Sequence, residues 1–206
     1  MRVFLRPLLA LLLNALLLCT AARADALPGL SLDPNALQPV PVPHSQLLED
    51  RDARLSAVQA MAQLRSGGVL QQGNPRLGYS GSTWWIAFSL DKQGSDALSL
   101  VIDNPFVDNV QLWVSASESS RPAALLAAGQ AGDLQPFSAR SEPYPNFILP
   151  LPALQAERVD VLLRIKSSSA LNLPLAIVSA TSSKQLLVRS WLKSGLICGA
   201  LLIMAL

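Results

Sequence analysis

The sequence predicts an all-β protein, an antiparallel β-sandwich of jelly-roll type with one short helix. About seven or eight short segments alternate between apolar and polar residues, which is typical of strands with one buried face. Gly, Pro, Asn and Ser separate these segments at short intervals and favour turns. The region after residue 24 holds a single cysteine, Cys198, so it predicts no internal disulfide and requires a buried apolar core.

Three strands are predicted in succession at residues 82–91, 97–103 and 107–116. Alternate residues of each strand are apolar and predict a core face. These are Trp84, Ile86, Phe88 and Leu90, then Leu98, Leu100 and Ile102, then Val110, Leu112 and Val114. The opposite face carries Trp85 and Trp113. This face is either covered by a second layer or forms an exposed stacking surface, and both alternatives stay open.

Four further segments complete the strand pattern. Residues 123–130 and 146–151 are short strand candidates, and the sequence GDLQPFSAR between them, residues 132–140, predicts a loop. Residues 158–166 alternate, which predicts Val159, Val161, Leu163 and Ile165 inward and Arg158, Asp160, Arg164 and Lys166 outward. Residues 171–177 alternate again, and Pro174 within them indicates an edge strand or a bulge.

The N-terminal region predicts a secretory signal peptide at residues 1–24. It has Arg2 and Arg6 before an apolar run at residues 8–18, and small residues at positions 22–24. Residues 25–44 are rich in Pro and Leu without periodicity and predict an extended leader ahead of the domain.

A short amphipathic helix is predicted after Leu47 and Leu48, introduced by the acids at positions 49, 50 and 52. Its apolar residues recur at helical spacing, and Gly67-Gly68 ends it. They are Leu55, Val58, Met61 and Leu64. We expect this helix to pack against the sheet rather than bind a partner.

The C-terminal region, residues 183–206, predicts a juxtamembrane segment and the start of a membrane helix. Lys184, Arg189 and Lys193 precede an apolar stretch at residues 196–206. That stretch is shorter than the roughly 20 residues that span a bilayer, so we expect the first part of a transmembrane helix. Together with the signal peptide, it predicts a translocated domain at residues 45–182 that a membrane helix anchors.

Composition argues against several functional classes. The net charge of +2 comes without a basic cluster, so nucleic acid is not expected as a partner. His44 is the single histidine and has no cysteine or carboxylate pattern beside it, so no metal or other cofactor is expected. No arrangement of a nucleophile with a base, or of paired carboxylates on one face, is indicated, and we expect no enzymatic activity.

Several segments in order resemble the type-2 extracellular sensing domain of bacterial seven-transmembrane receptors with diverse intracellular signalling modules. They are Leu47-Leu48-Glu49-Asp50, GYSGSTWWIAFSL at 78–90, NVQLWV at 109–114, GDLQPFSAR at 132–140, residues 147–151 and LNLPL at 171–175. The resemblance implies a jelly-roll similar to carbohydrate-binding modules, placed in the periplasm ahead of seven membrane helices. It therefore implies that residues 45–182 form a periplasmic domain anchored in the bacterial inner membrane. It also places a basic residue two positions after the strand tryptophan, where this sequence has Ala87.

Five residues are candidates for ligand binding. Trp85 and Trp113 share a face and suit stacking on a sugar ring, and the alternative is that they pack as core. Asp133 and Arg140 flank the GDLQPF loop, and Tyr144 follows it; a salt bridge or turn contact is the alternative role for the first two. The resemblance implies a periplasmic sensor that binds a carbohydrate or other small molecule and passes the signal to membrane helices. A dimerisation module, forming a homodimer or binding a partner sensor protein, is the alternative.

Overall fold

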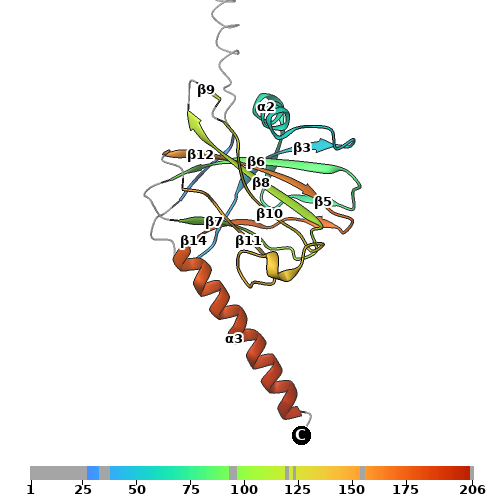
Figure 1. Ribbon diagram of the computed structural model, residues 1–206, viewed down its shortest axis with the longest axis vertical. Coiled ribbons are helices and arrows are strands. Elements are labelled where there is room, and N and C mark those ends of the chain that lie inside the picture. Colours follow the sequence, from blue (N-terminus) through green and yellow to red (C-terminus); the bar gives the residue numbers. More distant parts are fainter. Residues whose placement is uncertain are drawn as a thin grey trace, which may run out of the picture.

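The computed structural model describes residues 27–32, 38–92, 97–118, 121–122, 124–153 and 156–204. Two β-sheets pack face to face, helix α2 lies over one of them, and helix α3 leaves the sandwich on the opposite side (Figure 1). The predicted signal peptide lies outside the described residues. Within the described ranges, α2 and α3 are the α-helices, so the predicted all-β class with few helices is confirmed.

The larger sheet holds eight strands. Its order is β10 (Leu126–Ala131), β8 (Asn109–Glu118), β12 (Arg158–Lys166), β6 (Thr83–Asp91), β3 (His44–Asp50) and β4 (Val69–Gln72), with β1 (Gly29–Ser31) beside β6 and β9 (Arg121–Pro122) beside β8. The pairing of β1 with β6 is parallel, and the other described pairings of this sheet are antiparallel.

The smaller sheet is antiparallel and has four strands. Its order is β11 (Phe147–Pro150), β7 (Leu98–Ile102), β14 (Leu175–Ser179) and β2 (Val40–Pro41). A separate two-stranded ladder pairs β13 (Leu171–Asn172) with β5 (Arg76–Gly78). The jelly-roll topology stays a prediction.

The predicted strands exist, but three of them are arranged differently from a simple succession. β6, β7 and β8 match the predicted residues 82–91, 97–103 and 107–116. β7 lies in the smaller sheet, however, and β12 lies between β6 and β8, pairing with both. β12 and β11 match the predicted strands 158–166 and 146–151, and the weaker candidate at 123–130 corresponds to β10.

The main core fills the space between the two sheets. The predicted core faces of β6, β7 and β8 contribute Ile86, Phe88, Leu90, Leu100, Ile102, Val110, Leu112 and Val114, all buried, with Trp84 and Leu98 partly buried beside them. The core face of β12 contributes Val159, Val161, Leu163 and Ile165. Full burial of one such side chain is worth roughly 1.5–3 kcal/mol, so this layer is the main source of stability.

A second apolar layer lies on the outer face of the larger sheet, beneath α2 (Ala57–Gly67). Ala60, Met61 and Leu64 of the helix pack against Trp85 and Ala87 of β6, together with Leu162 of β12. The prediction that this helix packs against the sheet is confirmed. Its Gly67-Gly68 end is also confirmed, because Gly68 is the C-cap.

The start of α2 differs from the prediction. Residues 47–50 belong to β3, and the first turn of the helix holds no acid. Ser56 is the N-cap instead: its hydroxyl accepts from the Gln59 amide at 3.3 Å, and the Gln59 side-chain oxygen accepts from the Ser56 amide at 3.0 Å. This capping box satisfies two amides that the helix leaves without backbone partners.

Asp50 builds the turn between β3 and α2. Its carboxylate accepts hydrogen bonds from the amides of Arg54 at 3.1 Å and Leu55 at 3.0 Å, and from the Trp85 indole at 3.3 Å. Burial alone would raise the pKa of the Asp50 carboxyl, but these hydrogen bonds and the nearby Arg164 charge together lower it. The acid predicted to start a helix therefore closes a loop.

The segment predicted as an extended leader, residues 25–44, contains described residues that join the sandwich: β1 pairs with β6, β2 pairs with β14, and Leu30 and Val42 are buried. Asp160 was expected to face outward. It is buried beneath α2, where its carboxylate binds Arg65 of the helix and the Ser89 hydroxyl.

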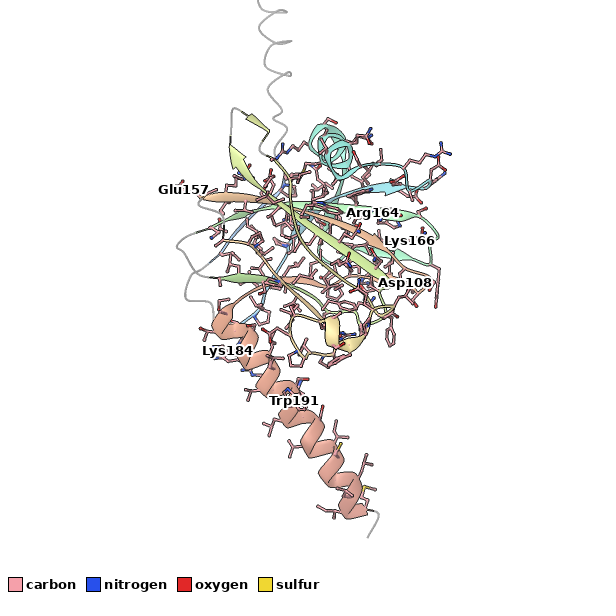
Figure 2. The ribbon with its side chains drawn as sticks, in the orientation of Figure 1. Asp108, Glu157, Arg164, Lys166, Lys184 and Trp191 are labelled. Carbon is pink, nitrogen blue, oxygen red and sulfur yellow. The ribbon has the colours of Figure 1, made fainter. Side chains whose placement is uncertain are left out.

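Residues 171–177 are predicted as one run with an edge or a bulge, and they split into β13 and β14 around Leu173-Pro174. Strand β14 then leads directly into α3 (Ala180–Met204), whose Ser182 amide donates to the Ser179 hydroxyl at 3.2 Å. The predicted juxtamembrane segment is thus part of one continuous helix of 25 residues, long and apolar enough to cross a membrane. Figure 2 shows Lys184 and Trp191 along this helix.

Candidate functional site

The two candidate tryptophans lie on the outer face of the larger sheet, under α2. Their ring centroids are 5.6 Å apart with a tilt of 35°, and β12 separates their strands. Trp85 is 1% exposed, while Trp113 is partly buried at the margin of the same cluster. The guanidinium of Arg164 lies 5.9 Å from the Trp85 ring (Arg164 is labelled in Figure 2). Trp85 therefore offers no exposed ring to a sugar, and the covered-face alternative holds for it.

Asp133, Arg140 and Tyr144 belong to a different region, the connection between β10 and β11. The structure does not bring them together with the tryptophans. This connection contains the short 3-10 helix η1 (Phe137–Ala139), drawn in yellow on the α3 side of the sandwich in Figure 1. The three residues also differ from one another in what they contact.

A cavity of about 170 Å³ lies between β10 and β11, which are edge strands of different sheets. Its apolar lining comes mainly from the two strands, including Phe147 and Leu149. Its polar lining consists of Gln130, Gln135, Arg140 and Ser141. Sequence reasoning missed the two glutamines and Phe147, because the cavity exists only where the edges of two sheets meet.

Arg140 is the charged group of this cavity. Its guanidinium carbon lies 4.8 Å from the centroid of Phe137 and 4.9 Å from that of Phe147, so the cation is held between two aromatic rings. Its Nη1 donates to the backbone carbonyls of Tyr144 at 2.8 Å and Pro145 at 2.5 Å. Among the described residues, its buried Nε has no hydrogen-bond acceptor.

Tyr144 faces the outer side of the smaller sheet rather than the cavity. It packs against the apolar cluster of Val101, Ile148 and Val178, and Leu186 of α3 packs against the same cluster. Burial raises the pKa of the Tyr144 phenol, and the negative charge of Asp103 raises it further. Tyr144 thus connects the loop of Arg140 to the surface that supports α3.

Asp133 is exposed and does not line the cavity, but its backbone fixes the loop. Its amide donates to the Val107 carbonyl at 2.9 Å. The preceding residue, Gly132, lies so close to the β7–β8 turn that a Cβ atom would overlap the backbone carbonyl of Asp108. The Gly-Asp pair of the GDLQPF segment is therefore a packing feature that holds the cavity wall in place.

Other polar clusters have structural roles. The Asp108 carboxylate, labelled in Figure 2, accepts from the amide of Ser168 at 2.8 Å and from the hydroxyl of Ser167 at 3.2 Å. Burial would raise the pKa of the Asp108 carboxyl, but these hydrogen bonds and Lys166 lower it. Across the described part of the chain, no group of three or more His, Cys, Asp or Glu side chains is placed to hold a metal.

Comparison with known proteins identifies the family. The sequence model of the family described as 7TMR-DISM extracellular 2 matches residues 42–179, which is more than half of the chain. No match is found among curated proteins. The matched residues run from just before β3 to the end of β14, so they include the cavity and exclude α3. The chain therefore belongs to the 7TMR-DISM extracellular 2 family, the extracellular sensing domains of seven-transmembrane receptors.

Proposed function

We propose that this chain is the periplasmic ligand-sensing part of a bacterial inner-membrane receptor, and that its ligand binds in the cavity between β10 and β11. The ligand is a carbohydrate or another small molecule, and the proposal assigns no catalysis to the chain. Family membership supports the sensing role. The observation that carries the site is Arg140, a cation held between two aromatic rings at a cavity with further polar groups.

The size of the cavity supports a small ligand. Pockets for drug-sized molecules have volumes of roughly 300–1,000 Å³, and this one has about 170 Å³. A single sugar ring, a compact metabolite or one end of a longer molecule fits that description better than an oligosaccharide lying in a groove. This supports a site at the sheet edge rather than on the tryptophan face.

The signal has a direct route to the membrane helix. Strand β11 lines the cavity and pairs with β7, which pairs with β14, and β14 continues into α3. The loop that Arg140 holds also carries Tyr144, which shares an apolar cluster with Leu186 of α3. A ligand that favours one arrangement of this loop would shift the position of α3, because it binds the two arrangements with different affinity.

The test blocks the mouth of the cavity in the whole chain, purified in detergent. Ala139→Trp places a large ring at an exposed lining residue, and Ser138→Trp places the same ring at its exposed neighbour, which does not line the cavity. Calorimetry against a panel of sugars, sugar acids and small hydroxy acids should show binding to the wild type and to Ser138→Trp, and none to Ala139→Trp. Binding that survives Ala139→Trp would place the site elsewhere.

A dimerisation role is the second candidate, and the edge strand β4 favours it. Val69 and Leu70 of β4 are 70% and 57% exposed, and its sequence VLQQ has no charge to discourage pairing with another edge. Two copies joined through β4 would form one continuous sheet. Light scattering of the chain in detergent tests this: Leu70→Lys should convert a dimer to a monomer, and an unchanged mass would remove the edge from consideration.

A further inference from the structure

We infer that the ligand of the β10–β11 cavity carries a carboxylate, bound by Arg140, on a small skeleton with hydroxyl groups. This inference rests on the proposed function, because it names the chemical class of ligand for the same cavity. Three features of the cavity lead to it: the charge of its lining, the unused edge of one guanidinium, and two free amide side chains.

The side chains that line the cavity carry one positive charge, and no acidic side chain among them balances it. Arg140 is the charged residue among those that line the cavity, and no aspartate or glutamate joins it there. Within the described ranges, no carboxylate lies within ion-pair distance of its guanidinium. The ring centroids of Phe137 and Phe147 lie 4.8 and 4.9 Å from the guanidinium carbon, and the two rings replace part of the water around the cation. A cation in such surroundings is stabilised most by an anion placed against it.

One edge of the guanidinium is used and the other is not. Nη1 donates to the carbonyls of Tyr144 and Pro145, which explains why Arg140 holds the loop. These contacts with the loop use only Nη1, and Nε and Nη2 have no acceptor among the residues described. Nε and Nη2 form the fork that a carboxylate engages with two parallel hydrogen bonds. Nε is buried, and the Phe137 ring beside the guanidinium is 57% exposed.

The remaining polar groups fit hydroxyl groups. Gln130 and Gln135 line the cavity, and among the described residues neither side chain has a hydrogen-bond partner. A primary amide both donates and accepts, so it suits an alcohol. Ser141 is already committed, because its hydroxyl donates to the Ile148 carbonyl. The cavity therefore combines one site for a carboxylate with two sites for hydroxyls, which is the pattern of hydroxy acids and sugar acids.

The experiment compares acids with alcohols of the same skeleton, using the whole chain in detergent. The pairs are lactate with propane-1,2-diol, glycerate with glycerol, gluconate with sorbitol, and glucuronate with glucose. Calorimetry should show that at least one acid binds about 10- to 100-fold more tightly than its alcohol, the effect of a hydrogen-bonded charge. An alcohol that binds as tightly as its acid would overturn the inference and leave the proposed function intact. If no member of any pair binds, the proposed function fails as well.

Two variants distinguish the role of Arg140 in binding the ligand from its role in holding the loop. Arg140→Gln should abolish the preference for the acid, but it also removes the loop contacts and could unfold the region. Gln135→Glu leaves Arg140 and its carbonyl contacts in place and adds a negative charge of nearly the same shape to the lining. It should weaken binding of the acid by about tenfold or more relative to binding of the alcohol, because the added charge repels only the carboxylate. Loss of the Gln135 amide donor affects the hydroxyl groups of both ligands alike, so the ratio of the two affinities is the readout. An unchanged ratio in folded Gln135→Glu would refute the role of charge in this cavity.

Discussion

The ion pair that holds α2 to the larger sheet gives a prediction whose size follows from burial. The guanidinium of Arg65, in the last turn of α2, binds the carboxylate of Asp160 on β12. The side chain of Asp160 is 3% exposed, and its second oxygen accepts from the Ser89 hydroxyl. We consider the substitution Arg65→Met, which keeps an unbranched apolar stem but removes the guanidinium and its charge.

The variant leaves a buried carboxylate without a counter-charge. Breaking a buried pair in this way costs about 3–5 kcal/mol, because the remaining charge stays away from water. Most domains have about 5–15 kcal/mol of total stability, so this is a large fraction of it. At roughly 2–4 °C per kcal/mol for a domain of this size, the melting temperature should fall by about 6–20 °C. Thermal unfolding of the chain in detergent, followed by tryptophan fluorescence, measures the change.

The double variant Arg65→Met with Asp160→Leu is the matched control. Replacing both members of a buried pair by apolar groups is often neutral or stabilising, so most of the lost stability should return. The reasoning would be refuted if Arg65→Met alone cost less than about 1 kcal/mol, the range of exposed surface pairs. It would also be refuted if the double variant were less stable than the single one, since the cost would then arise from lost packing rather than from the unpaired charge.

Three further predictions use the same unfolding assay. Trp85→Ala should lower the free energy of unfolding by about 3–5 kcal/mol, and Trp113→Ala should lower it clearly less, because the first ring is buried and the second only partly so. Equal small decreases for the two variants would contradict the burial of Trp85 under α2. Gly132→Ala should lose about 1–3 kcal/mol, because its methyl group would overlap the backbone of Asp108, and an unchanged melting temperature would show that the loop can move freely. Because the pKa of Asp50 is lowered in the folded state, its contribution to the free energy of unfolding is fully present above the ordinary aspartate pKa near 4. That contribution is lost as the pH falls through the lowered value. Asp50→Asn should therefore be less stable than the wild type at pH 7, with the gap narrowing below pH 4.

Side-chain alternation predicted the core faces because it depends only on the local geometry of a strand. The core residues of β6, β8 and β12 were predicted at the correct positions. The neighbours of each strand could not be predicted, because the pairing of β12 with both β6 and β8 joins residues far apart in the sequence. The short strands β1 and β2 were missed for a different reason: two or three residues among prolines show no periodicity.

Asp160 shows where alternation misleads. Its side chain does lie on the face opposite Val159 and Val161, as predicted, but that face is covered by α2 and not by water. The same covering layer buries Trp85 and Ala87. Alternation identifies which residues share a face, and it contains no information on whether a helix elsewhere in the chain lies over it.

The two sheets of the sandwich therefore differ in which of their surfaces a ligand can reach. The outer face of the larger sheet is closed over Trp85 by α2, a buried ion pair and the Asp50 turn, so a ligand cannot reach that ring without displacing a folded layer. The smaller sheet carries α3 directly and also forms one wall of the cavity through β11. In the function proposed above, a signal from the cavity would pass through β11, β7 and β14 to the candidate membrane span, and none of these strands lies under α2. This continuity is the reason for proposing the edge of the sandwich, and not its aromatic face, as the ligand site.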